Sequence, residues 1–330
     1  MTSSSSDRPG EFELIARLFA PLATAPGAFG LTDDAAIITP PAGEELVVTT
    51  DALVEAVHFL RSDPPASIAK KSLRMNLSDL AAKGAAPIAY LLALSLPDAT
   101  DMAWLKTFAH GLGEDQREYG VSLIGGDTTR TPGPLTLAIT ALGSVPRGTM
   151  IRRAGAKKGD LVFVSGTIGD AGAGLAILKG EGVAIPDAVR DELVARYREP
   201  SPRVSLGPAL RGLASAALDV SDGLLADLGH IAETSQVRIE VDAGRIPLSP
   251  ALRALRGNDP AAHVRAATAG DDYEIAFTAP ERARSAILKI AAEACVPVTE
   301  IGRVQAGHGV ALLDSAGHEI AVPRTGYVHF

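Results

Sequence analysis

Apolar residues recur along the first half of the chain at two spacings, one typical of helices and one of strands. Helical spacing predicts three helices, over 11–20, 67–83 and 104–119. Short apolar runs predict about five strands, over 35–38, 46–51, 88–96, 121–124 and 135–145. The run over 88–96 is long enough for a strand buried on both faces. The first half is therefore expected to be α+β.

The second half repeats the mixture of strands and helices. Strands are predicted over 161–164, 216–219 and 275–278, with one helix starting near Leu175 and another that buries Leu224, Leu225 and Leu228. A glycine-rich segment with five basic residues, 146–160, separates the halves and predicts a domain boundary. We expect a two-domain α/β (α+β) fold with a flexible tail over 1–10, an N-terminal domain over 11–146 and a C-terminal domain over 147–330.

Composition narrows the classes of protein. The chain has 330 residues, of which 46% are hydrophobic, and this is enough for two hydrophobic cores. The net charge is −8, from 31 basic and 39 acidic residues, and this negative charge argues against a nucleic-acid partner. The longest apolar stretch, 85–96, contains Pro87 and is too short to span a membrane, and the polar start does not resemble a signal peptide. The single cysteine, Cys295, lies among apolar residues and predicts a core position. We expect a cytoplasmic protein.

Oxygen-bearing side chains gather where predicted strands end. The strand over 121–124 leads into Gly125 and Gly126 and then Asp127, and the strand over 46–51 changes to Thr49, Thr50 and Asp51. Ligands collect at such positions in sheets covered by helices. A turn aspartate after a strand is the alternative.

The first half supplies further acids to this predicted site. Asn76 and Asp79 share a polar stripe on the helix over 67–83, and the turn before the strand over 35–38 contains Asp33 and Asp34. A solvated helix face and a solvated turn are the plain alternatives. Several carboxylates in one place repel one another unless cations lie among them, and oxygen ligands without a histidine or cysteine cluster favour Mg²⁺.

Three motifs in the second half are also candidates. Residues 165–174 are glycine-rich before a helix but lack the spacing of a P-loop, so close packing explains them as well as phosphate does. The segment 219–227 holds three aspartates at a strand–turn–helix junction, where Ser221 or Asp222 could cap the helix. The segment 270–274 adds Asp271 and Asp272 before a strand.

These motifs in this order resemble the thiamine-monophosphate kinase family of the aminoimidazole-ribonucleotide synthetase superfamily. The resemblance covers 10–330 and includes the motifs over 49–51, 76–82, 125–130 and 218–228. It implies Mg²⁺-dependent transfer of the γ-phosphoryl group of ATP to thiamine monophosphate. It also implies a homodimer formed through the N-terminal sheet, with the two small molecules as partners and neither nucleic acid nor membrane.

The resemblance also implies roles for individual residues. The implied metal ligands are Asp34, Thr49, Thr50, Asp51, Asp79, Asp127, Asp219 and Asp222. The implied ATP contacts are Gly126, Asp127, Arg153 and Ser221, and the implied contacts to thiamine monophosphate are His58, Asp271 and Tyr327. Asp127, Arg153 and Asp222 would carry the catalysis. His58, taken alone, is more typical of a packed, hydrogen-bonded histidine.

Two positions depart from the family pattern. Thr32 replaces a glycine beside Asp34, and Asp271 replaces a glutamate, which shortens this side chain by one methylene. Substrate affinity is the property that both changes would affect. The alternative functions are a purine-biosynthetic synthetase of the same superfamily and a nucleotide-binding regulatory module without activity.

Overall fold

The structure is a computed structural model that describes residues 10–181 and 185–327. Contacts divide the chain into two compact units, the first made of residues up to Leu80 with Ala86–Arg147, the second of Ala81–Ala85 with the residues from Gly148 onward. This division rests on contacts alone, so the limits 11–146 and 147–330 stay predictions. The predicted tail over 1–10 lies outside the described residues except for Gly10.

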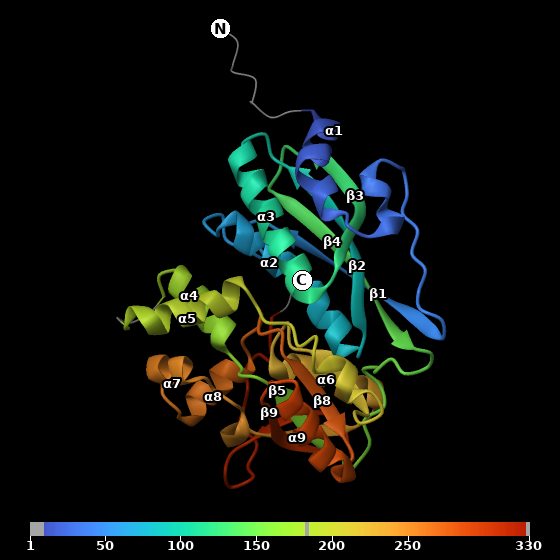
Figure 1. Ribbon diagram of the computed structural model, residues 1–330. Helices are drawn as coiled ribbons and strands as arrows, with labels where there is room; N and C mark the ends of the chain where they lie inside the picture. The colour runs from blue at the N-terminus through green and yellow to red at the C-terminus, as the bar shows by residue number, and fades with distance from the viewer. Residues whose placement is uncertain (1–9, 182–184, 328–330) are drawn as a thin grey trace. The chain divides into compact units, whose positions relative to one another are not determined.

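The first unit is a four-stranded sheet with helices packed on it (Figure 1). Its strands are β1 (Glu44–Val54), β2 (Ala86–Leu96), β3 (Ser122–Arg130) and β4 (Thr136–Pro146), in the order β1-β4-β2-β3. Its helices are α1 (Glu11–Leu14), α2 (Pro65–Ala82) and α3 (Met102–Tyr119), with π and 3₁₀ turns at Ile15–Phe19, Ala20–Leu22 and Pro26–Leu31. Only the β2–β3 pair is parallel.

The two faces of this sheet differ. Leu53, Ile139 and Leu92 lie on one face and are almost completely buried. The helices cover this face, because α2 accepts a hydrogen bond from Thr49 and α3 accepts one from Tyr90. We call it the helix-covered face.

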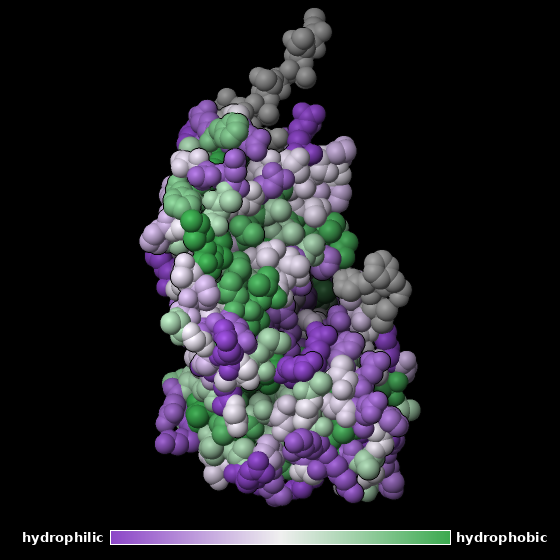
Figure 2. Space-filling model, turned by 90° about the vertical axis from the view of Figure 1, so that its right-hand side faces the viewer, coloured by the Kyte–Doolittle hydropathy of each residue, from purple (hydrophilic) through white to green (hydrophobic). Residues whose placement is uncertain are grey.

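Residues that alternate with these point to the other side. Val48, Ala52, Ala93 and Leu91 lie there and are exposed, Val48 by 58%. Figure 2 shows hydrophobic residues gathered in a band across the first unit. We call this side of the sheet the open face.

Four predictions for the first unit are wrong in detail. The segment over 35–38 forms no strand, and the helix predicted over 11–20 is α-helical only over Glu11–Leu14 and continues as π and 3₁₀ turns. The strand β2 is buried on one face only, since Leu91 is exposed. The strands β1 and β3 do not end at their polar residues: β1 continues to Val54, and β3 continues through Gly125 and Gly126 to Arg130. These polar residues pair within the sheet, and hydropathy does not reveal such pairing.

The second unit is a six-stranded sheet between two layers of helices (Figure 1). Its strands are β5 (Leu161–Ser165), β6 (Ala216–Asp219), β7 (Arg238–Asp242), β8 (Ile275–Ala279), β9 (Val298–Gln305) and β10 (Gly309–Leu313), in the order β10-β7-β9-β5-β8-β6. Its helices are α4 (Asp170–Leu178), α5 (Asp187–Arg198), α6 (Leu224–Ser235), α7 (Pro250–Arg256), α8 (Pro260–Ala267) and α9 (Arg284–Glu293). The mixed α/β fold with two sheets confirms the predicted fold class.

Alternation along β5 builds a core on each side of this sheet. Val162 and Val164 pack with α6, α7 and α8, whereas Leu161 and Phe163 pack with α9. The prediction that Cys295 lies in the core is wrong, because this residue is exposed in the turn after α9. Among the described residues, no helix combines the length and the apolar character needed to cross a membrane.

Candidate functional site

Two carboxylates of the first unit lie close together on the helix-covered face. Asp79, near the end of α2, accepts a hydrogen bond of 2.5 Å from the Thr49 hydroxyl. Burial, with a smaller contribution from the charge of Asp79, raises the pKa of Asp51 to about 6. A partly buried carboxylate whose pKa is raised by burial and by a neighbouring carboxylate is a site that a cation would stabilise. The structure therefore brings together Thr49, Asp51 and Asp79.

The polar stripe on α2 is buried rather than solvated. Asn76 lies one turn before Asp79, is completely buried and donates a hydrogen bond to the Ser72 carbonyl. Its Oδ1 accepts no hydrogen bond from the described residues. A buried amide oxygen without a donor costs free energy, so the solvated-face alternative does not hold for Asn76.

Asp127 lies elsewhere in the same sheet. The register pairs Asp127 with Ala93, Ala93 with Ala138, and Ala138 with Ala52, so Asp127 shares the open face with Ala52. It is exposed, and its strand is at the opposite edge from β1. Thr50 is also on the open face, where its hydroxyl contacts that of Thr140 at 3.0 Å. Within this unit Asp127 is thus separate from Asp51 and Asp79.

Asp34 lies in an exposed loop without regular structure. The preceding turn places Phe29, Gly30 and Leu31 in left-handed conformations. Thr32 closes this turn, because its hydroxyl donates to the Phe29 carbonyl at 2.7 Å. With a φ of −102°, Thr32 needs no glycine-like freedom, so this departure from the family pattern is accommodated locally.

His58 follows β1 in a tight turn. Its Nδ1 accepts a hydrogen bond of 3.0 Å from the Val54 amide, which leaves the proton on Nε2 in the neutral ring. The ring is half-buried. This hydrogen bond agrees with the packed-histidine alternative and also fixes the direction of Nε2, so a contact to substrate stays a prediction.

The second unit organises its candidate residues around the loop after β6. Asp219 ends β6 and is 7% exposed, and Ser221 and Asp222 follow in the loop. The prediction that Ser221 or Asp222 caps α6 is wrong, since the helix starts after Gly223 without a side-chain cap. The Oδ2 atom of Asp227 instead accepts the amides of Ser221, Asp222 and Gly223, at 3.0, 3.1 and 3.0 Å.

Two distant segments meet this loop through their backbones. Asp271 donates its amide to the Ser221 carbonyl at 2.8 Å, and Tyr327 donates its amide to the Asp222 carbonyl at 2.9 Å. Gly326 fits because a Cβ there would come within 2.6 Å of the Asp222 carbonyl oxygen. Four of the predicted site residues are thereby brought together: Ser221, Asp222, Asp271 and Tyr327.

Arg153 lies beside β6. The amide of Ala217, in β6, donates to the carbonyl of Arg152 at 2.9 Å, which places the next residue, Arg153, along this strand. Arg153 itself is exposed. The glycine-rich segment 146–160 therefore borders, at Arg152, the strand that leads to Asp219.

Sequence reasoning did not single out the function of Asp227 or the presence of His230. Ligand atoms of Asp222, Asp227 and His230 lie within 4.8 Å of one another. Burial, with a smaller contribution from Asp222, raises the pKa of Asp227 to about 7 despite its three amide donors. The sequence signal that could have revealed this group is its spacing, because Asp227 follows Asp222 by five residues and His230 follows Asp227 by three.

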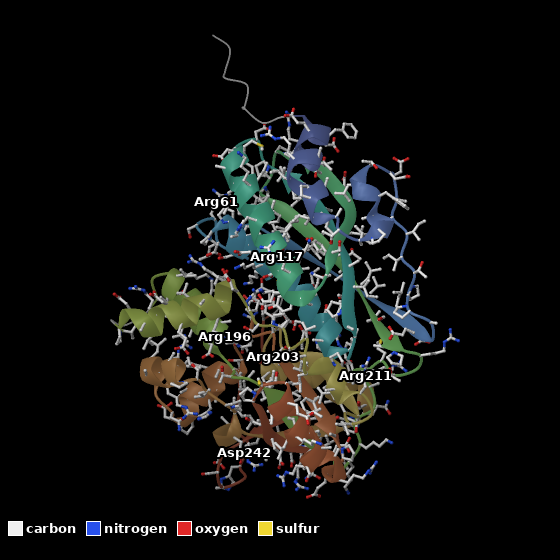
Figure 3. The ribbon with its side chains drawn as sticks, in the orientation of Figure 1. Arg61, Arg117, Arg196, Arg203, Arg211 and Asp242 are labelled. Atoms are coloured by element: carbon white, nitrogen blue, oxygen red, sulfur yellow. The ribbon has the colours of Figure 1, made fainter. Side chains whose placement is uncertain are left out.

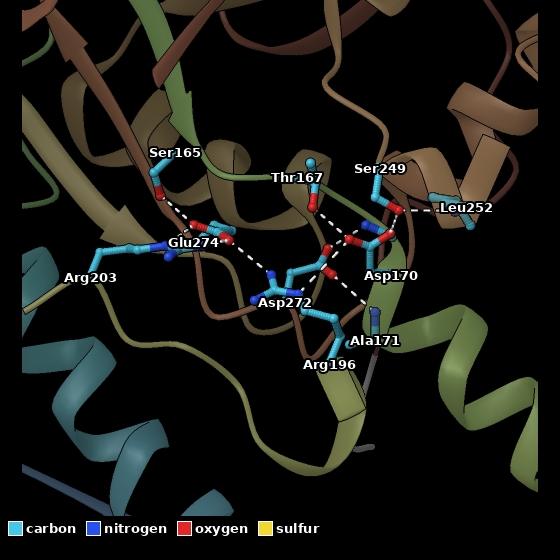
Figure 4. A network of polar contacts seen from close by, with 11 residues as sticks. Ser165, Thr167, Asp170, Ala171, Arg196, Arg203, Ser249, Leu252, Asp272 and Glu274 are labelled. Atoms are coloured by element: carbon cyan, nitrogen blue, oxygen red, sulfur yellow. Dashed lines mark hydrogen bonds and ion pairs between the residues drawn. The ribbon is translucent and has the colours of Figure 1, made fainter. Parts of the chain in front are cut away.

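Sequence reasoning also missed a buried ion network beneath Asp271. Its anions are Asp170, Asp272 and Glu274, and its cations are Arg196 and Arg203 (Figures 3 and 4). Burial disfavours the charged form of Glu274, but Arg203 and Arg196 outweigh burial and lower its pKa. Burial raises the pKa of Asp272 well above its ordinary value. The network joins three segments that are far apart in sequence, at 170, 196–203 and 272–274, so residue spacing gave no signal for the pairing between them.

Comparison with known proteins follows the division into two units. The family model of the AIR synthase related protein, N-terminal domain, matches residues 32–145, and that of the C-terminal domain matches 157–315. The thiamine-monophosphate kinase of Caulobacter vibrioides is 45% identical over 325 residues, covering 97% of this chain and 91% of the relative. The chain belongs to the thiamine-monophosphate kinase family.

Other members of the thiamine-monophosphate kinase family are similar to this chain over most of its length. The enzyme of Escherichia coli K12 is 42% identical and covers 97% of this chain and 98% of its own length. The crystal structure of the kinase from Stenotrophomonas maltophilia K279a is 46% identical, with a TM-score of 0.80 over 88% of this chain and 91% of that chain. A solved structure described as AaThiL complexed with AMPPCP and TMP is 30% identical, with a TM-score of 0.76 over 99% of this chain and all of that chain.

Proposed function

We propose that this protein phosphorylates thiamine monophosphate to thiamine diphosphate with ATP. The observation that carries the proposal is the full-length match to thiamine-monophosphate kinases, one of which binds AMPPCP and TMP. The curated relatives described above are named thiamine-monophosphate kinases, which favours this function over a purine-biosynthetic synthetase. The alternative of an inactive regulatory module depends on the departures from the family pattern. At Thr32 this argument does not hold, because Thr32 adopts an ordinary backbone conformation and closes the turn before Asp34 with a hydrogen bond.

Magnesium ions are the cations that fit these acids. The donors of the first unit are carboxylate and hydroxyl oxygens: Asp34, Thr49, Thr50, Asp51, Asp79 and Asp127. Those of the second unit are Asp219 and Asp222. The mutual repulsion of Asp51 and Asp79 supports this assignment on physical grounds. When bound, Mg²⁺ would neutralise charge on the phosphates.

Gly126, Arg153 and Ser221 are the proposed ATP contacts. The glycine has a structural reason of its own, because a Cβ at Gly126 would come within 1.9 Å of the Leu92 carbonyl oxygen in β2. The glycine at position 126 is therefore not by itself an indication of a contact to ATP. The exposed guanidinium of Arg153 is suited to a phosphate, to which it can donate two hydrogen bonds.

The reaction needs positioning more than proton transfer. A phosphate oxygen of thiamine monophosphate forms a bond to the γ-phosphorus of ATP, and the bond from this phosphorus to the bridging oxygen breaks, which releases ADP. The attacking phosphate is largely ionised at pH 7, so no strong general base is required. Arg153 would orient the phosphates and balance part of their charge, and Asp127 and Asp222 would act by holding the Mg²⁺ that does the same.

The second unit carries two proposed contacts to thiamine monophosphate. Tyr327 is 49% exposed and presents an aromatic face suited to a cationic ring. Asp271, whose segment is hydrogen-bonded to the same loop after β6 as Tyr327, presents a carboxylate. His58 of the first unit is the third proposed contact. All three assignments rest on the family pattern.

The open face of the first sheet supports a homodimer. It exposes Val48 and Leu91 within a sheet whose other face is fully covered, and exposed apolar faces of this kind typically mark protein interfaces. A second copy on this face would also approach Asp127, so we propose that the dimer completes the site. A cytoplasmic location is part of the same proposal.

One assay tests the proposed function. Purified protein is incubated with ATP, MgCl₂ and thiamine monophosphate, and thiamine diphosphate is measured by chromatography. We expect product that depends on both substrates and disappears with EDTA. Absence of product at every Mg²⁺ concentration, in protein that binds ATP, would overturn the proposal in favour of a regulatory module.

A further inference from the structure

The segment that carries Asp271 has an unusual backbone. Asp271 and Tyr273 both adopt left-handed conformations, with φ of 68° and 51°. Such conformations are unfavourable for residues with a Cβ and persist only where the surroundings hold them. Two of them, two residues apart, indicate that the direction of this segment is imposed.

Backbone hydrogen bonds hold the segment against the loop after β6. The amides of Asp271 and Tyr273 donate to the carbonyls of Ser221 and Val220, each at 2.8 Å, and the Val220 amide donates to the Glu274 carbonyl at 2.8 Å. A Cβ on Gly270 would come within 2.6 Å of the Ser221 carbonyl oxygen. The segment therefore cannot shift without breaking the loop that carries Ser221 and Asp222.

The acids that alternate with Asp271 and Tyr273, Asp272 and Glu274, anchor the segment through their side chains (Figure 4). The carboxylate of Asp272 accepts the amides of Gly169 and Ala171, at 2.7 and 3.4 Å. Glu274 accepts hydrogen bonds from Ser165 and Arg203, each at 2.6 Å, and from Arg196 at 2.9 Å. Both acids are almost completely buried.

Among residues 271–274 only Asp271 is partly exposed, and a hydrogen bond from within the segment orients its side chain. The Tyr273 hydroxyl donates to Oδ1 of Asp271 at 3.1 Å. The tyrosine is 3% exposed, so packing fixes its ring and thereby the position of the hydroxyl. The carboxylate is thus held by a rigid donor two residues away.

We propose that Tyr273 is a positioning residue: its hydroxyl holds the Asp271 carboxylate in the orientation that binds the cationic part of thiamine monophosphate. The inference rests on the proposed function. Asp271 is one methylene shorter than the glutamate of the family pattern, and a short side chain held by a fixed donor has little freedom to adjust. The hydroxyl therefore contributes to binding of this substrate and not to binding of ATP.

A double-mutant cycle with Tyr273→Phe, Asp271→Asn and the double variant tests the proposal. Steady-state KM and kcat are measured for both substrates, and binding of thiamine monophosphate is measured by calorimetry. We expect Tyr273→Phe to raise KM and Kd for thiamine monophosphate about tenfold, with kcat and KM for ATP little changed. Asp271→Asn should weaken binding at least as much, and the double variant should match Asp271→Asn alone.

Tyr197→Phe is the matched control, because Tyr197 is equally buried in the same unit and lies in α5. It should leave both KM values unchanged. Additive effects of the two substitutions, or unchanged substrate binding in Tyr273→Phe, would overturn the role of Tyr273. Unchanged binding in Asp271→Asn would also overturn it while the kinase activity stands. If the wild-type protein lacked turnover, the proposed function would fail, and calorimetry would still decide whether Tyr273 acts through Asp271.

Discussion

Asp51 and Asp127 lie on opposite edges and opposite faces of one four-stranded sheet. Asp51 pairs with Ile139 on the helix-covered face of β1, whereas Asp127 lies on the open face of β3. Three strand spacings separate their strands, about 14 Å. One metal ion therefore cannot bind both aspartates of the same sheet. If both serve one reaction, they do so with different ions or in different active sites of a dimer.

Asp127→Asn should abolish activity and leave the fold intact. The residue is exposed, so its charge contributes little to stability, but a ligand oxygen with its negative charge is lost. We expect kcat to fall at least about 100-fold, with the melting temperature nearly unchanged. The control is Asp98→Asn, an exposed acid of the same unit that pairs with Arg130. Near-normal turnover in Asp127→Asn would refute its role in catalysis.

Val48→Glu should dissociate the proposed dimer. The substitution places a charge on the open face, and burying an unpaired carboxylate in an apolar interface is unfavourable. Val57→Glu is the matched control, since Val57 is 56% exposed against 58% for Val48 but lies in the turn after β1. Light scattering should show a monomer for Val48→Glu and a dimer for Val57→Glu. Equal masses for the two variants would contradict a dimer formed through this face.

The order of helices and strands was largely predictable from hydropathy, but the residues at which some strands end were not. The helices α2 and α3 and the strands β1, β2 and β4 lie where apolar spacing predicted them. The predicted strand ends, at Asp51 and at Ile124 before Asp127, are wrong because Asp51 and Asp127 both pair with neighbouring strands. Pairing is a non-local property, so the polar residues looked like the start of a loop.

The sequence predicted which residues form the candidate site, but not which residues hold them in place. Motif order identified Asp222 and Asp271, whose loops meet in the second unit. It did not identify the role of Asp227, which accepts the loop amides from inside α6, or Arg196, which pairs with Glu274 from a helix 78 residues away. Such contacts depend on how distant segments pack, and one sequence without its fold carries little record of them.

The stability of metal-free protein should depend on pH through Asp51. Its pKa rises on folding from 3.8 to about 6, so ionisation in the folded state costs free energy. In EDTA, this contribution is absent below about pH 4 and destabilises the fold progressively as the pH rises through 6. The cost is at most about 3 kcal/mol, and partial exposure of Asp51 reduces it.

Asp51→Asn isolates this contribution. The melting temperature of the wild type minus that of Asp51→Asn, in EDTA, should fall between pH 4 and pH 7. Addition of MgCl₂ at pH 7.5 should stabilise the wild type more than the variant. A difference that is independent of pH, or an equal response to MgCl₂, would count against both the raised pKa and the metal site.

Asp227→Ala should disorder the loop that carries Ser221 and Asp222. Three consecutive amides converge on one carboxylate oxygen, and removing it leaves them without their acceptor, which costs about 1–3 kcal/mol for each amide that stays buried. We expect a lower melting temperature and a higher Mg²⁺ concentration for half-maximal activity. Asp227→Asn keeps one acceptor oxygen and should recover much of the stability. Asp191→Ala, an exposed acid on α5, is the control that should change neither quantity. Normal Mg²⁺ dependence in Asp227→Ala would show that the loop keeps its shape without this carboxylate.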